Sequence, residues 1–273
     1  MTYLCDLHMH STYSDGQYRP AELVRLAKER GLQVIALTDH DAIGGIAEAQ
    51  AEGEKQGVRV LPGVEFSARD YHTFHILGYC FDREILAKNK LFSRLADGRA
   101  ERSVRIRDYL RTKGVEVDLD EVRETAGPGV IGRPHFCQVM LRHGVCKTWE
   151  EVFDTYLDTD EFHAVVEDKP AAAECIAAVH EAGGIVSMAH PYQTGLEGAD
   201  LEALVKRMKE AGQLDAIECW HSGHTQERSS FYLSLAKKYH LIVTGGSDFH
   251  GEQVKADRPM VRLTLELERM LQR

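Results

Sequence analysis

Short apolar runs alternate along the chain with longer segments that carry apolar residues at every third or fourth position. The runs are rich in Val, Ile and Leu and predict strands. We expect these strands over residues 3–9, 33–38, 58–66, 74–80, 184–189, 214–220 and 241–245. The spacing between them predicts amphipathic helices over roughly 20–30, 43–56, 170–182, 200–211 and 225–239. Such alternation favours a largely parallel sheet with outer helices, here a closed or nearly closed β/α barrel.

The alternation breaks between about residues 98 and 166, where the pattern predicts helices only. These helices are expected over 98–113, 120–126, 133–143 and 148–157. We therefore predict an α/β fold with two units. A barrel is formed by residues 1–97 and 167–273, and an all-helical cap subdomain is inserted at residues 98–166.

Composition narrows the classes of function. The net charge of −10 argues against binding to long nucleic acid, which needs a basic surface. No run of about 20 apolar residues predicts a membrane span, and the N-terminus lacks a signal-peptide pattern. Six scattered cysteines without a CxxC pair fit free thiols, so we expect a cytoplasmic protein. The unusual count is histidine, with fourteen.

Many of these histidines, and several carboxylates, lie at or near the ends of predicted strands. In the opening segment DLHMHSTYSDG, His8 and His10 are two positions apart and share one face of a strand, as does Asp6. Near the C-terminus, SDFH repeats this spacing with Asp248 and His250. The motifs TDH, GVE, FHILGY and AHP add His40, Glu65, His75 and His190. Because the strand ends of such folds meet at one mouth, we expect one cluster there.

With Asp15, the cluster holds nine residues, too many for the four to six ligands of one ion. Imidazole and carboxylate ligands without thiolate suit Mn²⁺, Fe²⁺ or Zn²⁺. We therefore expect two or three divalent metals. A single histidine beside a strand is more often structural, and we interpret His72, His143, His163, His180 and His240 as surface or structural residues.

The ordered motifs HxH…D, TDH, GxE, H, HP and SDxH resemble the polymerase and histidinol phosphatase (PHP) family. They run from His8 to His250 and so cover most of the chain. The resemblance implies a phosphoesterase with a distorted seven-stranded β/α barrel, related to the amidohydrolases. It also implies nine metal ligands: His8, His10, Asp15, His40, Glu65, His75, His190, Asp248 and His250.

By the same resemblance, Glu65 bridges two metals, manganese being expected first and iron or zinc as alternatives. One ion would be held by His8, His10 and Asp248, a second by His75 and His190, and a third by Asp15, His40 and His250.

The segments IGRPHF (131–136), FDTYL (153–157) and EAGGIVSMAHP (181–191) look like the capped branch of this family. That branch includes nucleoside 3′,5′-bisphosphate phosphatases and 5′→3′ exonucleases acting on short RNA. One departure is YLDTDEF, which stands where many relatives carry a Gly-rich stretch. It puts in question any substrate contact from residues 158–162.

The cap offers arginines as candidate phosphate ligands. In the predicted helix 92–113, Arg99 and Arg102 interrupt an apolar stripe, and a buried guanidinium needs an anionic partner. The alternative is a solvated edge or a salt bridge to a cap carboxylate. By their positions on the wheel, Arg105, Arg107 and Arg111 are expected to be exposed.

A second phosphate-binding site is predicted at GRPHF, where Pro134 begins a helix. Arg133 and His135 then lie at a helix N-terminus, which favours an anion. Tyr13, Trp220, His221 and His224 are expected near the mouth.

We predict hydrolysis of the 3′-phosphate of a nucleoside 3′,5′-bisphosphate by a metal-bridging hydroxide. The cap arginines would bind the second phosphate, and His221 or His224 would protonate the leaving oxygen. The expected catalytic residues are His8, His10, Glu65, His190, His221, His224 and Asp248.

Three alternatives remain open: a 5′→3′ exoribonuclease, a histidinol phosphatase and a non-catalytic metal-binding module. A nucleotide bisphosphate or a short oligoribonucleotide is the expected partner. No membrane, long nucleic acid or obligate protein partner is expected.

Overall fold

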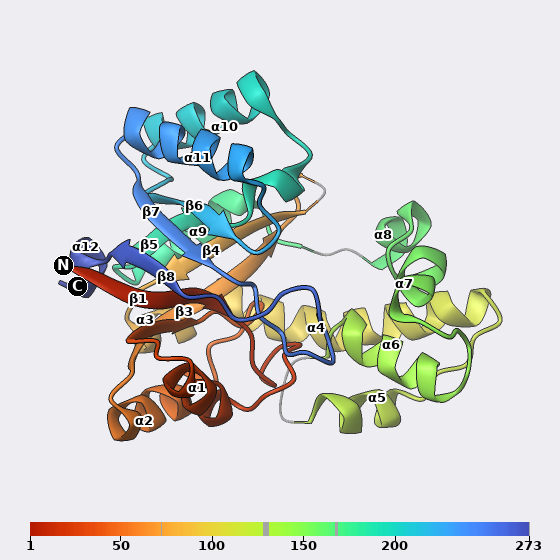
Figure 1. Cartoon of the computed structure of the whole chain (residues 1–273). Coiled ribbons are helices and arrows are strands. Elements are labelled where there is room, and N and C mark those ends of the chain that lie inside the picture. The colour runs from red at the N-terminus through yellow and green to blue at the C-terminus, as the bar shows by residue number, and fades with distance from the viewer. Residues whose placement is uncertain (72, 128–130, 167–168, 273) are drawn as a thin grey trace.

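The computed structural model describes residues 1–71, 73–127, 131–166 and 169–272. Its eight strands form one sheet in the order β7-β6-β5-β4-β3-β2-β1-β8 (Figure 1). The strands are β1 (Thr2–Met9), β2 (Val34–Leu37), β3 (Arg59–Ala68), β4 (Phe74–Tyr79), β5 (Ile185–Met188), β6 (Ala216–His221), β7 (Ile242–Gly246) and β8 (Leu263–Glu266). All seven predicted strands are therefore present.

The strand β8 is an addition to the prediction. Its sequence LTLE is short and half polar, so it contains no apolar run that would predict a strand. It pairs antiparallel with β1, with Cys5 opposite Leu263. A separate parallel bridge between Met9 and Phe249 joins the end of β1 to the segment after β7. The sheet thus curls into a nearly closed barrel.

The strand β4 runs antiparallel to both of its neighbours, β3 and β5, whereas a largely parallel sheet was expected. Only residues 69–73 connect β3 to β4, and a parallel connection needs a crossover of a dozen or more residues. As a result, the start of β4 and not its end reaches the mouth of the barrel. His75 is therefore carried to the same edge as the ends of the parallel strands.

Helices cover the outside of the sheet and build the cap (Figure 1). They are α1 (Pro20–Glu29), α2 (Ile46–Gln56), α3 (Arg83–Ala87), α4 (Lys90–Thr112), α5 (Leu119–Ala126), α6 (Arg133–Arg142), α7 (Trp149–Val152), α8 (Asp160–Val166), α9 (Ala172–Glu181), α10 (Gly198–Glu210), α11 (Gln226–Lys238) and α12 (Glu268–Leu271). A π-helical turn at Phe153–Leu157 continues α7. Within the described residues, no helix has the length and apolar character needed to cross a membrane.

The long helix α4 packs on two separate cores. Leu91 and Leu95, near its start, belong to the barrel core beneath α9. Ile106 and Leu110, near its end, belong to a second core with Phe136 of the cap. The predicted boundary between residues 97 and 98 lies inside this continuous helix, and the division into two units stays a prediction.

Candidate metal centre and substrate pocket

The nine predicted ligand residues lie together at one edge of the barrel. His8 lies in β1, Glu65 in β3 and His75 at the start of β4. His10 directly follows β1, Asp15 lies in the loop after it, and the other four residues follow β2, β5 and β7. His8, His10, Glu65 and His250 have no solvent-exposed surface.

Glu65 stands at the centre of the cluster. Its Oε2 lies 3.1 Å from Nε2 of both His8 and His10. Its Oε1 lies 2.8 Å from Nδ1 of His75 and 2.9 Å from Nε2 of His190. Burial favours a raised pKa, but His8, His40 and His75 overcome it and hold the pKa of Glu65 well below its ordinary value. The carboxylate therefore stays charged and presents one oxygen to each of two groups of imidazoles.

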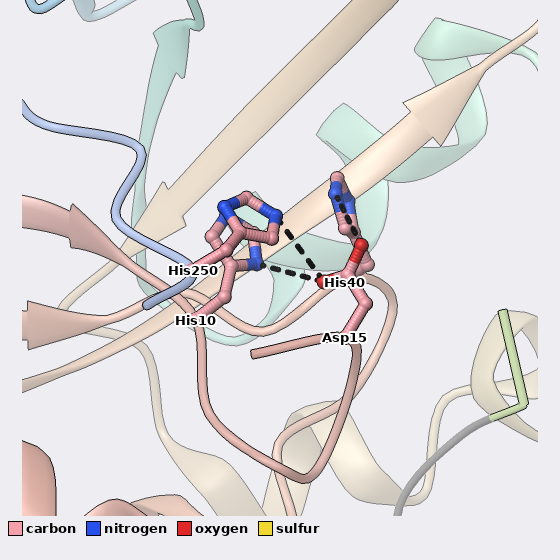
Figure 2. A group of neighbouring side chains, drawn as sticks. All are labelled: His10, Asp15, His40 and His250. Atoms are coloured by element: carbon pink, nitrogen blue, oxygen red, sulfur yellow. Dashed lines mark ion pairs between the residues drawn. The ribbon is translucent and has the colours of Figure 1, made fainter. Parts of the chain in front are cut away.

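A second group surrounds Asp15, as Figure 2 shows. Its Oδ1 lies 3.3 Å from Nε2 of His250 and 3.7 Å from Nδ1 of His10. Its Oδ2 lies 3.9 Å from Nε2 of His40. The donor atoms of these four residues all lie within 4.8 Å of one another, close enough to surround one ion.

Asp248 joins the two groups from the end of β7. Its Oδ1 lies 3.2 Å from Nε2 of His10 and 3.4 Å from Nδ1 of His250. With His8, His10 and Glu65, it forms another set whose donor atoms lie within 4.8 Å. The left-handed backbone of Asp248, with φ at 56°, turns the chain back so that both Asp248 and His250 reach the cluster.

The cluster fits divalent cations by its unpaired atoms. Among the described residues, several fully buried nitrogen and oxygen atoms that could bind a metal ion have no hydrogen-bond partner. They include Nε2 of His8 and His10, Oδ1 of Asp15, Oε2 of Glu65 and Nδ1 of His190. A buried polar atom left unpaired costs about 1–3 kcal/mol. Concentrating such atoms in one place is therefore unfavourable unless a cation binds them, and these nitrogen and oxygen donors suit Mn²⁺, Fe²⁺ or Zn²⁺.

Two further buried carboxylates, Glu218 and Asp39, lie behind the cluster and were not predicted from the sequence. Glu218 of β6 accepts a hydrogen bond from Nδ1 of His8 at 3.0 Å and another from the backbone N–H of His190 at 2.6 Å. Asp39 accepts from the hydroxyls of Ser11 and Ser14, both at 2.7 Å. An acidic residue inside the apolar run AIECW is the signal that could have revealed Glu218.

Asp6 does not join the cluster, and the expectation that it shares a face with His8 and His10 is wrong. The pairing of β1 with β2 shifts register between Asp6 and Met9, which breaks the simple alternation. The Asp6 carboxylate instead accepts from Ser247 Oγ at 2.6 Å and from the Val261 N–H at 3.0 Å. It therefore anchors the segments on both sides of the loop after β7.

His221 and His224 have different surroundings. Nδ1 of His221 accepts from the Gly223 N–H at 2.9 Å, which leaves the ring proton on Nε2, 3.6 Å from Oδ2 of Asp248. His224 and Trp220 line a second cavity of about 360 Å³, which His221 also lines. Burial lowers the pKa of His221 to about 3 and that of His224 to about 4, so both are neutral imidazoles at physiological pH.

A pocket of about 600 Å³ lies between the metal cluster and the cap. The cluster supplies Asp15, His40, His75, His190 and Asp248 to its wall. Its cationic side chains are Arg69, Arg94, Arg102, Arg105, Arg133, Lys169, Lys255 and Arg258. This pocket is strongly cationic in a chain of net charge −10, which suits an anionic substrate.

The arginines of α4 only partly follow the prediction. Arg102 lines the pocket, whereas the side chain of Arg99 lies outside the described residues. The expectation that Arg105 is exposed is wrong, because it follows Arg102 by three positions and so shares its face. Arg105 lines the pocket, and its Nη2 is buried with no hydrogen-bond partner among the described residues. Arg107 is half-buried rather than exposed, and neither it nor Arg111 lines the pocket.

The GRPHF segment begins α6 as predicted, but Arg133 and His135 have different surroundings. Arg133 lines the pocket and forms an ion pair with Asp158, which belongs to the divergent YLDTDEF stretch. His135 is buried, and its Nδ1 accepts from the Gly132 N–H at 2.9 Å. Neither His135 nor Tyr13 is among the described residues that line the pocket.

Comparison with known proteins agrees with this geometry. The PHP domain family matches residues 6–226. The chain belongs to this family. The 5′-3′ exoribonuclease of Haemophilus influenzae is 32% identical over 251 residues, covering 92% of this chain and 91% of the relative. The 3′,5′-nucleoside bisphosphate phosphatase of Chromobacterium violaceum is 31% identical over 247 residues, covering 90% and 86%.

A solved structure gives the same fold for this PHP protein. It comes from Bifidobacterium adolescentis and is described as a metal-dependent phosphoesterase. Its TM-score is 0.82 at 29% identity, over 98% of this chain and 94% of that chain. The predictions of family and barrel are confirmed, and this PHP protein is a metal-binding phosphoesterase.

Proposed function

We propose that this PHP protein hydrolyses the 3′-phosphate of nucleoside 3′,5′-bisphosphates. The observation that carries the proposal is a pocket lined by phosphate-binding groups from both the barrel and the cap. The barrel contributes members of the cluster centred on Glu65, and the cap contributes Arg102, Arg105 and Arg133. At about 600 Å³, the pocket has room for one nucleotide between them.

The nine clustered residues would hold two or three divalent ions, with manganese expected first. Glu65 would help to hold two of them, because its two oxygens face different imidazoles, and the grouping around Asp15 supports a separate position for a third. Bound ions of this kind activate water at neutral pH and neutralise charge on a phosphoryl group. Glu218 holds the His8 ring by its Nδ1–H and leaves Nε2 directed into the cluster.

The cap arginines bind the phosphate that is not hydrolysed. Arg105 has a buried Nη2 that needs an acceptor, and a phosphate oxygen supplies one. Arg133 is paired with Asp158, and Arg105 pairs with Glu101 at 3.4 Å through Nη1 only, so a nitrogen of Arg105 is left for an anion. Arg99 belongs to the same predicted set.

Of the two histidines proposed to assist the leaving oxygen, His221 is better placed. Its Nε2 lies 3.6 Å from Oδ2 of Asp248 at the cluster, whereas His224 donates from Nδ1 to the Cys219 carbonyl at 3.2 Å. His221 remains neutral and donates a hydrogen bond to the developing alkoxide.

A 5′→3′ exoribonuclease is the second candidate. It is favoured by the 32% identity to the Haemophilus influenzae enzyme, which nearly equals the identity to the bisphosphate phosphatase. Both activities use the same cluster on different phosphoesters. Histidinol phosphatase has no specific support in the pocket. The nine clustered donor residues argue against a non-catalytic module.

Product analysis tests the proposal. The Mn²⁺-loaded protein is incubated separately with adenosine 3′,5′-bisphosphate and with a 5′-phosphorylated RNA trinucleotide. We expect rapid release of phosphate and AMP from the first substrate and an intact trinucleotide. Rapid release of 5′-mononucleotides from the RNA, with little phosphate from the bisphosphate, would overturn the proposal in favour of the exoribonuclease.

A further inference from the structure

The carboxylate of Asp248 has two different sides. Its Oδ1 faces the cluster, 3.2 Å from Nε2 of His10. Its Oδ2 lies near three nitrogen-bearing side chains. It pairs with the guanidinium of Arg258, and it lies 3.5 Å from Nζ of Lys255 and 3.6 Å from Nε2 of His221. A single negative charge is therefore shared between the metal cluster and two basic side chains, and Lys255 Nζ also lies 3.1 Å from Nε2 of His250.

Lys255 and Arg258 come from the loop that joins β7 to β8, which the sequence analysis did not single out. The loop is tied to the barrel at both ends. The Gln253 N–H donates to the side chain of Gln17 at 3.0 Å, and the Val261 N–H donates to Asp6 at 3.0 Å. These anchors hold the two cations over the cluster, where both line the pocket.

The two side chains of this pair share one ion-paired carboxylate. Within the described residues, Asp248 is the only carboxylate within 4.0 Å of either cation. The side chain of Arg258 is only 18% exposed and that of Lys255 is 32% exposed, so water compensates them incompletely. Asp248 has less charge to offer them when its other oxygen also binds a metal ion.

We propose that Lys255 and Arg258 bind the phosphoryl group that is hydrolysed, beside the residues that would hold the metal ions. A guanidinium matches two phosphate oxygens with parallel hydrogen bonds, and a neighbouring ammonium adds a point charge. In phosphoryl transfer, charge spreads over the equatorial oxygens, so such donors favour the transition state. The inference rests on the phosphoesterase part of the proposed function but not on the bisphosphate as substrate.

The test compares Arg258→Gln and Lys255→Gln with the control Arg262→Gln, an exposed arginine of the same loop outside the pocket. Three quantities are measured on Mn²⁺-loaded protein. They are kcat/KM for p-nitrophenyl phosphate, the affinity for inorganic phosphate by calorimetry, and the metal content by mass spectrometry. We expect Arg258→Gln to lower kcat/KM about 100-fold and phosphate affinity at least 10-fold, with unchanged metal content. Lys255→Gln should show smaller losses, and Arg262→Gln none.

Two results would overturn the inference. One is unchanged phosphate affinity in both loop variants. The other is loss of metal from Arg258→Gln with activity restored by excess Mn²⁺, which would make Arg258 a support for Asp248 only. If Arg258→Gln fails to fold, Lys255→Gln decides, because the Lys255 side chain is more exposed than that of Arg258. A protein that cleaves p-nitrophenyl phosphate but not the bisphosphate contradicts the proposed function and leaves this test intact.

Discussion

At the scale of single residues, Glu218 fixes two members of the cluster at once. One oxygen sets the tautomer of His8, and the other binds the backbone of His190. Burial favours a raised pKa, but His8 overcomes it and lowers the pKa of Glu218 to about 2. The carboxylate therefore acts as an acceptor only, which is what orientation of a ligand imidazole requires.

Replacing Glu218 by Gln should lower metal affinity by about 10- to 100-fold, because an amide can present its N–H₂ group to His8 and destabilise the required tautomer. Isothermal titration with Mn²⁺ measures the change. The control is Glu210→Gln, an exposed residue paired only with Lys206 at 3.8 Å. Equal Mn²⁺ affinity in Glu218→Gln and the control would show that this carboxylate does not orient the ligands.

Arg105 makes a separate prediction about substrate recognition. Arg105→Met should raise KM for adenosine 3′,5′-bisphosphate at least 10-fold, since a charged hydrogen bond contributes about 1.5–3 kcal/mol. KM for a substrate with one phosphate should change little. Arg107→Met is the matched control, because Arg107 pairs with Asp108 and does not line the pocket. Equal effects on both substrates would contradict a second phosphate site in the cap.

At the scale of elements, the barrel depends on close contact between β1 and β7. A Cβ on Gly246 would lie 2.3 Å from Cβ and 2.4 Å from the backbone nitrogen of His8. No side chain larger than hydrogen therefore fits there without moving the strand that carries His8 and His10. A glycine at the end of β7 thus couples the closure of the barrel to the shape of the metal cluster.

Gly246→Ala should reduce the free energy of unfolding by roughly 1–3 kcal/mol, as expected for overpacking, and should also weaken Mn²⁺ binding. Urea denaturation of the metal-free protein measures the first effect, and titration measures the second. Gly132→Ala provides the control, because its nearest neighbour would lie at 3.4 Å, an ordinary contact. Wild-type stability in Gly246→Ala would contradict this view of the barrel.

The sequence predicted the apolar strands and their motifs better than it predicted β8 and the loop between β7 and β8. Apolar runs located β1 to β7, and the motifs they carry identified the nine clustered residues. β8 escaped because its exposed positions are polar and it is defined only by pairing with β1. Lys255 and Arg258 were not predicted as site residues, because a loop has no periodic sequence pattern. Their approach to Asp248 depends on the contacts that anchor the whole loop.

At the scale of the whole molecule, two cores meet along α4, and the pocket lies where they meet. The helix presents Leu95 to the barrel core, Ile106 to the cap core and Arg102 to the pocket between them. The cap arginines are thus held by a rigid element that also contacts the barrel. A change in the packing of the cap is therefore expected to alter substrate binding more than metal binding.

Removal of metal should destabilise the whole protein. Without ions, buried atoms such as His10 Nε2 and Glu65 Oε2 lack partners, and a ligand present at 100 times its Kd stabilises by about 2.7 kcal/mol. For a chain of this size, that corresponds to a fall in Tm of roughly 5–10 °C. Calorimetry in EDTA and in excess Mn²⁺ measures it. Identical melting temperatures would mean that the cluster binds no ion tightly.

The most direct test of the account is the number of ions bound by the wild type and by Glu65→Gln, measured by mass spectrometry after dialysis against Mn²⁺. The account predicts two or three ions per wild-type chain. Glu65→Gln should lose at least one ion, together with at least 1,000-fold of the phosphoesterase activity. A wild type with less than one ion per chain, or a Glu65→Gln variant with full metal content and activity, would contradict the central role of this cluster.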